Sequence, residues 1–242
     1  MYYESRGSEV PDLAPSATVS SSPHPFLLGL AGRPEGAVGG TAALHFHGLL
    51  PRMPDEICLA VPRSASTWER HAVRHCGGYL FRLTEVRAQA FFGVQEASFD
   101  GARFRVFDPE RAIVDLMSYP GRSGGFLEAL RLLEESVDRL DVPKLVYYGW
   151  RFGKLSLGKR LGWSLERCGV DAETLYPLLE WPAVNYLRLD PAGSRRGRCD
   201  SRWHVIVNQE SPRSRAPQKT DLARTQPRTA VPNSPLERVG SV

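Results

Sequence analysis

Hydrophobic and polar residues alternate most regularly in the segment QEASFDGARFRVF, which spans residues 95–107. Alternation with a period of two predicts a pair of half-buried strands. Asp100-Gly101 is the preferred dipeptide for a two-residue hairpin turn, because both central positions of that turn need a positive φ. We therefore predict a hairpin with an inward face of Ala97, Phe99, Phe104 and Val106 and an outward face of Arg103 and Arg105.

The next segment, FDPERAIVDLM, predicts a capped amphipathic helix. Asp108 is placed to accept amide hydrogens of the first turn, Pro109 suits the first helical position, and Glu110 favours the positive end of the helix dipole. Helical spacing predicts one buried stripe, formed by Ala112, Ile113, Leu116 and Met117. Asp115 fits none of these roles, so two interpretations remain open: an ordinary hydrogen-bonded or exposed carboxylate, or a functional one.

Apolar residues at helical spacing predict further helices in the second half of the chain. The predictions are a helix with Phe126, Leu127, Leu130 and Leu133 on one face, one capped near Asp141 with Leu145, Tyr148 and Phe152 beneath, one with Leu157, Leu161, Leu165 and Cys168 that ends at Gly169, and one over residues 171–179. A short helix is also expected in GGTAALHFHGL, with Thr41 as its N-cap and Gly48 just past its end.

Short apolar runs predict strands at residues 57–62, 78–83, 184–189 and 202–208. Together with the hairpin and the helices, they predict an α+β fold class. We expect a largely antiparallel or mixed sheet in the first half of the chain and again at its end, packed against a bundle of four to five helices.

Both ends of the chain differ from the rest. Residues 1–25 and 209–242 are rich in Ser, Pro, Arg and Thr, so we expect them to be disordered and residues 26–208 to form the folded block. Six basic and three acidic residues in the C-terminal tail account for +3 of the net charge of +4. The remaining block carries about +1, so the overall charge is weak evidence for a nucleic-acid surface.

The location of the protein is predicted from what the sequence lacks. Its four cysteines contain no C-x-x-C pair, which suits a reducing compartment. The N-terminus lacks the basic start and apolar stretch of a signal peptide, and no segment approaches the roughly 20 apolar residues of a membrane span. We therefore predict a cytoplasmic protein with no membrane partner.

Metal and cofactor chemistry finds little support in the motifs. His45 and His47 lie two residues apart, which on a helix directs the rings away from each other, and His71 and His75 have the spacing of a helical pair without a companion ligand cluster. GGTAAL, GRSGG and GKRLG match no phosphate-loop pattern and are typical of caps or turns. No metal, cofactor or catalytic residue is predicted.

Two other functions stay open as alternatives. Asp108 and Asp115, seven residues apart on one predicted helix, could serve with the histidines in a metal-dependent phosphodiesterase or nuclease. An arginine-rich loop between the last two predicted strands could clamp phosphates of a nucleic acid or an acidic partner, or it could be a solvated loop. Its candidate contact residues are Arg195, Arg196, Arg198 and Arg202.

The order and spacing of six segments resemble the C-terminal antitoxin domain of the AbiEi family of bacterial antitoxins. They are TAALHFHGL, ICLAVPR, VFDPERAIVDLM, GGFLEAL, KLSLGKRLGWSLERCGV and RLDPAGSRRGRCDSRWHVIVN, and the resemblance covers residues 26–208. It implies a cytoplasmic bacterial protein that is not an enzyme. Such a protein opposes an AbiEii-type nucleotidyltransferase toxin in a type IV toxin–antitoxin (abortive infection) system, without a stable complex between the two.

Typical members of this family begin with a winged helix-turn-helix domain that binds the promoter of their own operon. Only some 25 residues precede the match here, whereas a winged helix needs about 60 residues. We therefore expect the DNA-binding module to be missing, which leaves a role as transcriptional regulator open.

Overall fold

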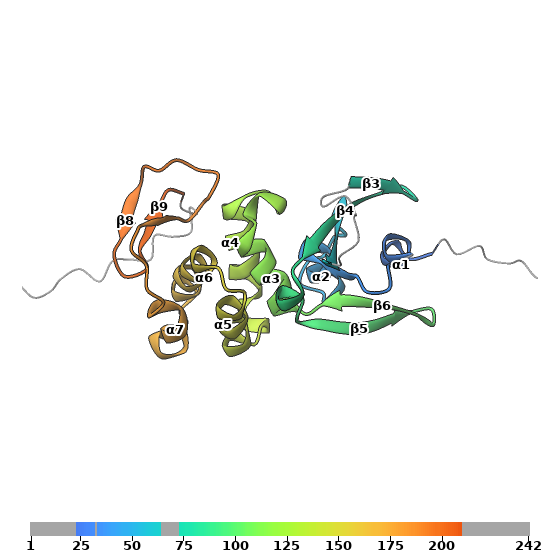
Figure 1. Ribbon diagram of the computed structural model, residues 1–242, viewed down its shortest axis with the longest axis horizontal. Helices are drawn as coiled ribbons and strands as arrows, with labels where there is room; N and C mark the ends of the chain where they lie inside the picture. Colours follow the sequence, from blue (N-terminus) through green and yellow to red (C-terminus); the bar gives the residue numbers. More distant parts are fainter. Residues whose placement is uncertain (1–22, 32, 64–72, 210–242) are drawn as a thin grey trace, which may run out of the picture. The chain divides into compact units, whose positions relative to one another are not determined.

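The structure is a computed structural model, and it describes residues 23–31, 33–63 and 73–209 of the 242-residue chain. A mixed sheet of six strands, in the order β3-β4-β2-β1-β6-β5, forms one layer of this part (Figure 1). Its strands are β1 (Ala37–Gly39), β2 (Glu56–Pro62), β3 (Val73–Cys76), β4 (Tyr79–Val86), β5 (Val94–Phe99) and β6 (Ala102–Phe107).

Helices α3 to α7 form the next layer, and a small sheet lies on their other side, whereas α1 and α2 lie against the large sheet (Figure 1). The helices are α1 (Pro25–Leu30), α2 (Gly40–Phe46), α3 (Pro109–Ser118), α4 (Phe126–Ser136), α5 (Val142–Arg151), α6 (Leu155–Arg167) and α7 (Ala172–Leu179), with 3₁₀ turns η1 (Ala88–Ala90), η2 (Pro120–Arg122) and η3 (Val137–Arg139). The small sheet, ordered β7-β9-β8, consists of β7 (Leu187–Arg188), β8 (Arg198–Asp200) and β9 (Val205–Val207).

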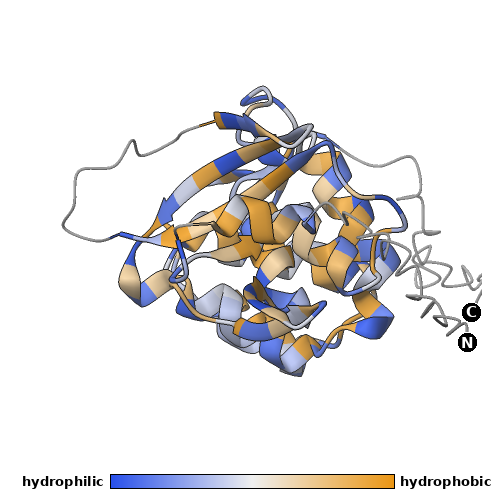
Figure 2. Cartoon of the chain, turned by 90° about the vertical axis from the view of Figure 1, so that its right-hand side faces the viewer, coloured by the Kyte–Doolittle hydropathy of each residue, from blue (hydrophilic) through white to orange (hydrophobic). Residues whose placement is uncertain are grey.

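The predicted α+β class is confirmed. Antiparallel hairpins, β3-β4 and β5-β6, form the two edges of the large sheet, while β2 with β4 and β1 with β6 pair in parallel. Helix α3 is central, because it packs against α2 on the side of the sheet and against α4, α5 and α6 on the other. Figure 2 shows hydrophobic residues gathered where these elements face each other.

The Asp100-Gly101 hairpin forms as predicted, with φ values of 47° and 77° at the two turn residues. Phe104 and Val106 are buried. The inward position of Phe99 is wrong, because its side chain is 44% exposed. Phe99 lies next to the turn of an edge hairpin, and its ring packs against that of His24, with ring centres 4.5 Å apart.

Helix α3 also matches its prediction. The Asp108 carboxylate caps the helix by accepting the backbone N–H of Arg111 at 2.8 Å, and Pro109 is its first residue. The four residues of the predicted stripe are all buried. The caps at Asp141 and Asp171 and the left-handed Gly169 after α6 are confirmed as well.

Three predictions for side chains or local structure are wrong. Leu127 is 37% exposed, because it shares the solvent row of α4 with Arg131, while the inner rows of the helix are buried. Thr41 is not an N-cap: helix α2 begins at Gly40, and the cap position is Gly39. His75 lies on strand β3, so the helical spacing that pairs it with His71 does not apply, and His71 itself lies outside the described residues.

The C-terminal strands are shorter than predicted. Only residues 187–188 and 205–207 pair within the spans 184–189 and 202–208, and the intervening loop supplies the third strand, β8. Most of the predicted disordered ends, residues 1–22 and 210–242, lies outside the described residues. No helix in the described part of the chain is long and apolar enough to cross a membrane.

Candidate functional site: a basic pocket between the sheet and the helices

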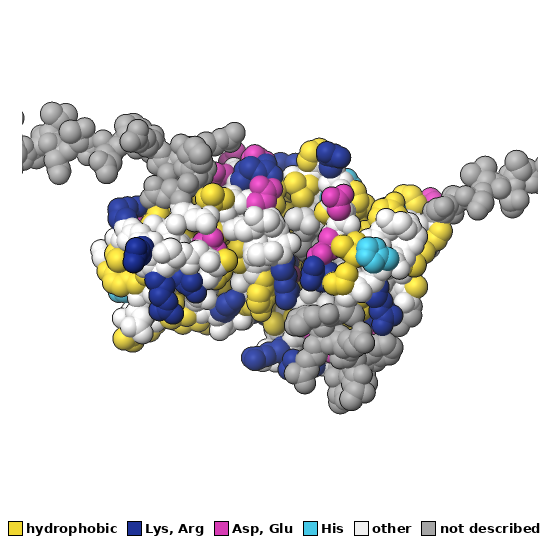
Figure 3. Space-filling view, turned by 90° about the horizontal axis from the view of Figure 1, so that it is seen from above, with side chains coloured by type: hydrophobic (Ala, Val, Ile, Leu, Met, Phe, Trp, Pro, Cys, Tyr) yellow, Lys and Arg dark blue, Asp and Glu magenta, His cyan; other side chains and the backbone are white. Residues whose placement is uncertain are grey.

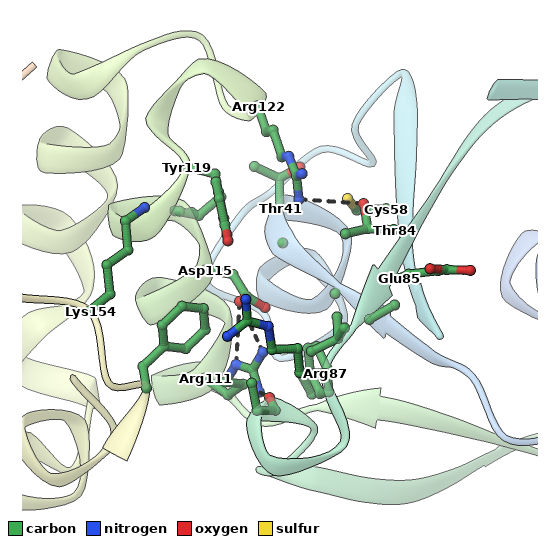
Figure 4. A pocket seen from close by; sticks show the side chains of 18 of the residues that line it. Thr41, Cys58, Thr84, Glu85, Arg87, Arg111, Asp115, Tyr119, Arg122 and Lys154 are labelled. Carbon is green, nitrogen blue, oxygen red and sulfur yellow. Dashed lines mark hydrogen bonds and ion pairs between the residues drawn. The ribbon is translucent and has the colours of Figure 1, made fainter. Parts of the chain in front are cut away.

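A pocket of about 530 Å³ lies between strands β2 and β4 of the large sheet and helix α3 (Figure 4). This volume is within the range of small-molecule sites, about 300–1,000 Å³. Its polar lining residues are Thr41, Glu56, Cys58, Arg63, Thr84, Glu85, Arg87, Arg111, Asp115, Tyr119, Arg122 and Lys154, and Leu116, Phe107 and Phe152 are among its apolar ones.

The guanidinium of Arg111 closes one end of the pocket. Its side chain is fully buried and lies over the rings of Phe92 and Phe107, at 4.6 and 4.4 Å from their centres. It donates hydrogen bonds to the backbone carbonyls of Ala90 and Phe92 at 2.6 and 3.0 Å. Arg111 therefore holds the turn η1 against α3 and has a structural role.

Asp115, whose role the sequence leaves open, pairs with this arginine. The carboxylate accepts from Nε and Nη2 of Arg111 at 3.3 and 3.1 Å, and 23% of its side chain remains exposed. Burial raises the pKa of Asp115, whereas Arg111 and Arg122 oppose that rise. The carboxylate thus lines the pocket as part of an ion pair that also fixes Arg111.

Two further cations flank the ring of Tyr119. The guanidinium carbon of Arg122 and Nζ of Lys154 each lie 4.4 Å from the centre of that ring, so the two charges are separated by at most twice this distance. Lys154 donates to the carbonyl of Ser118 at 2.8 Å, and Arg122 reaches Oγ1 of Thr84 at 3.4 Å. Figure 4 shows Arg122 and Lys154 on either side of Tyr119.

The pocket is cationic on balance. Glu85 pairs with Arg63 at 3.5 Å, and Glu56 pairs with Arg82 outside the lining. Among the described residues, no carboxylate lies within ion-pair distance of Arg122, Lys154 or the exposed Arg87 at the pocket rim. Three positive charges therefore border the cavity without an acidic partner from this part of the chain.

The thiol of Cys58 also lines the pocket. Burial and the charge of Asp115 together raise the pKa of Cys58 to about 11, although Arg122 acts in the opposite direction. The thiolate is the nucleophilic form of cysteine. At neutral pH Cys58 is therefore protonated and reacts weakly.

A second polar network joins α3 to α5. Asp108 accepts from the hydroxyl of Tyr148 at 2.9 Å and pairs with Lys144 at 3.0 Å. Glu110 also pairs with Lys144, at 2.9 Å, and accepts the backbone N–H of Asp141 at 3.0 Å. Burial alone lowers the pKa of Lys144, but hydrogen bonds to Glu110 and Asp108 outweigh it and raise that pKa above its usual value. These contacts give Asp108 and Glu110 a structural role.

The carboxylates and histidines of the metal-dependent alternative do not meet in one cluster. Asp108 pairs with Lys144 and Asp115 with Arg111. A ring nitrogen of His45 lies 2.9 Å from the carbonyl of Leu50. His47 makes a similar contact to a backbone carbonyl of β6. Within residues 23–31, 33–63 and 73–209, no group of three or more His, Cys, Asp or Glu side chains could hold a metal ion.

The predicted arginine loop lies at the small sheet and contributes nothing to the pocket lining. Arg202 pairs with Glu166 of α6 at 2.7 Å, and Arg198 lies on strand β8. Arg195 and Arg196 are exposed in the loop before β8. Figure 3 shows Lys and Arg side chains gathered over the end of the fold that carries this sheet. The four arginines thus share a region of the fold, and one of them is already used in an ion pair.

Sequence patterns do not identify the cationic pocket residues Arg87, Arg122 and Lys154. Arg122 lies in GRSGG, which matches no phosphate-loop pattern, and Lys154 stands alone before a helix. No local spacing links these positions, because the tertiary fold alone brings them to one cavity.

Comparison of the chain with protein-family models finds no match, and comparison with curated proteins finds none either. Among solved structures, the chain is similar to the crystal structure of the RV2827C protein from Mycobacterium tuberculosis. The two share 17% sequence identity with a TM-score of 0.53, and the match covers 76% of this chain and 68% of that one. This level of likeness shows a shared fold and leaves function to be argued from the site.

Proposed function

We propose that this chain is an antitoxin of the AbiEi type, which opposes an AbiEii-type nucleotidyltransferase toxin of a bacterial type IV toxin–antitoxin system. In this proposal the protein acts in the cytoplasm, without catalysis of its own and without a stable complex with the toxin. The resemblance of six segments along residues 26–208 supports it.

One observation about the fold carries the proposal. Four of the six segments supply side chains to the wall of the basic pocket: Thr41 from TAALHFHGL, Cys58 from ICLAVPR, Asp115 from VFDPERAIVDLM and Lys154 from KLSLGKRLGWSLERCGV. Segments so distant in the sequence meet at one cavity only through the tertiary fold. Their convergence supports the proposal, because it brings residues of the resembling segments together at one candidate site.

A growth-rescue assay tests this function. The nucleotidyltransferase-like toxin encoded beside this gene is expressed with and without the full chain, and surviving cells are counted. We expect rescue by the wild-type chain. A failure to rescue by folded, abundant protein would contradict the proposal.

Matched variants ask whether the pocket takes part in rescue. Arg122→Gln combined with Lys154→Gln removes two charges at the cavity. Arg131→Gln is the control, because Arg131 is an exposed arginine on α4 that pairs with Glu128 and Glu135 of the same helix and does not line the pocket. Exposed ion pairs of this kind contribute about 0–1 kcal/mol, so the control folds normally. We expect lower survival with the double variant than with the control.

Nucleic-acid binding is a second candidate, favoured by the exposure of Arg195 and Arg196 in a braced loop. Arg188 donates to the carbonyl of Gly193 at 2.7 Å, and Nδ2 of Asn208 donates to the carbonyl of Ser194 at 2.7 Å, so the loop presents its arginines from a fixed base. Phosphate contacts make binding salt-dependent, with a slope of about −0.9 per contact on B-DNA.

The test is fluorescence anisotropy with a labelled DNA duplex at several salt concentrations. We expect Arg195→Gln with Arg196→Gln to weaken binding and to make the slope of log K against log salt shallower by about 2, since two phosphate contacts are lost. An unchanged slope, or the same loss in Arg131→Gln, would contradict a role for this loop.

A further inference from the structure

We propose that the outer face of helix α5 binds single-stranded nucleic acid, with bases stacked on Tyr147 and Trp150 and phosphates held by Arg151 and by cations at the rim of the basic pocket. This surface is separate from the arginine loop of the small sheet. The inference therefore depends neither on that loop nor on the antitoxin role.

Two large aromatic side chains lie exposed on α5. Tyr147 is 50% exposed and Trp150 is 53% exposed, and their ring centres lie 6.4 Å apart with an angle of 30° between the ring planes. Residues three apart on a helix share a face. The face of α5 that packs into the fold, with Leu145 and Gly149, is buried. The aromatic pair is therefore apolar surface that the packing of the described chain does not use, and such clustered surface is typical of interaction sites.

The charge beside this pair is positive. Arg151 follows Trp150 and lies four residues after Tyr147, so its position on the helix surface adjoins both. Its guanidinium carbon lies 4.3 Å from the centre of the Phe92 ring. No carboxylate of the described residues lies within ion-pair distance of it. Lys144, on the other side of Tyr147, is already held by two carboxylates, so Arg151 is the cation available to an anionic ligand here.

The basic pocket continues this surface. Residues 152–154, which directly follow Arg151, line the pocket, and the ring of Phe92 belongs to the segment after η1. Arg87, the residue before η1, lies at the pocket rim and, like Lys154, has no acidic partner within the part of the chain that the structure describes. The two glutamates of the lining are each neutralised by an arginine. The aromatic pair thus adjoins a surface with several separate cations.

A polymer of planar and anionic groups matches this arrangement. In a nucleic-acid strand the bases stack on aromatic rings, while the phosphates contact separate cations one at a time. The base faces must be accessible, which favours a single strand, because in a duplex the bases stack on one another. An acidic amphipathic helix would need an apolar groove instead. Tyr147 and Trp150 lie on the outer face of a helix and do not line the pocket, so the geometry favours the single strand over an acidic protein segment.

Fluorescence anisotropy on the full chain at low salt, with labelled oligo(dT) and oligo(U) of about 12 nucleotides, tests the proposal. We expect at least one strand to bind, and the tighter of the two identifies the preferred sugar. Tyr147→Ala and Trp150→Ala should each weaken binding about tenfold, because each removes a stacked base. Arg151→Gln should make the slope of log K against log salt shallower by about 0.7, the value for one phosphate contact on a single strand.

Tryptophan fluorescence gives a second readout that reports stacking itself. Of the tryptophans in the described chain, Trp150 is the most exposed, whereas Trp163 and Trp203 are buried. A stacked base should therefore quench mainly Trp150. Trp150→Phe keeps an aromatic ring, so it should bind the strand with much less quenching and only a small loss of affinity. Quenching of the same size in Trp150→Phe would contradict stacking at this residue.

Phe99→Ala is the matched control. Phe99 is also an exposed aromatic residue, at 44%, but it lies next to the turn of the β5–β6 hairpin, far from α5 (Figure 1). Its affinity should stay within about twofold of wild type, and melting curves check that each variant is folded.

Three results would overturn the proposal. The first is no binding of either strand at about 100 µM protein. The second is binding that Tyr147→Ala and Trp150→Ala both leave unchanged, which would place the strand elsewhere on the protein. The third is displacement of the labelled strand by poly-L-glutamate as efficiently as by the unlabelled strand, because the surface would then recognise negative charge without bases.

Discussion

Trp203 lies directly against Gly162: a Cβ atom added to this glycine would sit 2.1 Å from Cζ3 of the indole ring. The indole is fully buried, and its Nε1–H donates to the Glu166 carboxylate at 2.7 Å. Trp203 therefore packs the small sheet against α6. Gly162 leaves space for its indole ring, and Glu166 holds the ring in place through a hydrogen bond.

We predict that Gly162→Ala destabilises the protein. Alanine favours a helix over glycine by up to about 1 kcal/mol, but the clash with a fixed, buried ring costs about 1–3 kcal/mol, so the net change is a loss of stability. The free energy of unfolding in urea measures it. Gly121→Ala is the control, because a Cβ there has nothing within 4 Å. Equal stability of the two variants would show that the indole moves aside easily.

Asp108 caps α3 and also contacts Tyr148 and Lys144. Its removal should therefore lower the free energy of unfolding by more than the loss of a helix cap alone. Loss of a capping carboxylate costs about 0.5–2 kcal/mol, and Asp108→Ala also leaves the Tyr148 hydroxyl and Lys144 without this acceptor. We expect a total loss of about 2–3 kcal/mol, reduced by the partial exposure of Lys144.

Tyr148→Phe separates the two contributions to that loss. It removes one hydrogen bond to Asp108 and leaves the cap intact, so we expect a cost of about 1 kcal/mol. Urea unfolding of both variants measures the difference. If Asp108→Ala were no more destabilising than Tyr148→Phe, the helix cap and the ion pair with Lys144 would contribute nothing to stability.

Features set by neighbouring residues in the chain were predictable from the sequence. The Asp100-Gly101 turn needs only the φ preferences of two residues, and the Asp108 cap needs only a carboxylate three residues before the amide it accepts. Both therefore follow from the sequence alone. The buried stripe of α3 is local in the same sense, because helical spacing fixes its face.

The errors arise where tertiary neighbours decide. Phe99 has the correct alternation for an inward residue, yet the core does not extend to the tip of its hairpin. Leu127 is apolar, but it lies on the row of α4 that no other element covers within the described chain. The hydrophobicity of a residue alone does not predict whether another element packs against its face of the helix or strand.

The pocket depended on contacts that no local pattern encodes. Thr84 and Cys58 become neighbours through the parallel pairing of β4 with β2, and Arg122 reaches Thr84 only because η2 follows α3 back to the sheet. In contrast, the proposed loop residues Arg195 and Arg196 are consecutive in sequence, so they were visible as a cluster. That loop remains a prediction.

Stability should fall in alkaline solution because of the contact between Tyr148 and Asp108. Burial and the hydrogen bond to Asp108 together raise the pKa of Tyr148 to about 12. The folded protein therefore holds this proton more tightly than the unfolded chain, whose tyrosine titrates near 10. The corresponding stability is complete below pH 10 and is lost as the pH rises towards 12.

Urea midpoints measured between pH 9 and 12 check this expectation, with Tyr148→Phe as the comparison. The raised pKa of Lys144 acts in the same direction, since its stabilisation is also lost as the pH rises above the unfolded value. We expect wild type to lose stability more steeply than Tyr148→Phe, which retains the Lys144 contribution but lacks that of Tyr148. Parallel curves for the two proteins would rule out a shifted Tyr148.

The four cysteines should divide into two fast and two slow thiols. Cys76 and Cys199 are exposed, whereas burial raises the pKa of Cys58 and of Cys168 to about 11 each. Because the thiolate is the reacting form, the two raised thiols are mostly protonated at pH 8 and are also shielded from reagent. A disulfide reagent such as 5,5′-dithiobis(2-nitrobenzoic acid) should therefore label two thiols rapidly and two at least about tenfold more slowly.

Single substitutions assign the phases of this reaction. Cys76→Ser and Cys199→Ser should each remove one fast equivalent, and Cys58→Ser should remove one slow equivalent while the fast phase stays unchanged. In urea all four thiols should react at one rate, because unfolding removes the burial that separates them. Rapid labelling of Cys58 in the folded protein would mean that its thiol is ionised in the pocket. It would contradict the protonated, weakly reactive thiol that the surroundings of Cys58 indicate.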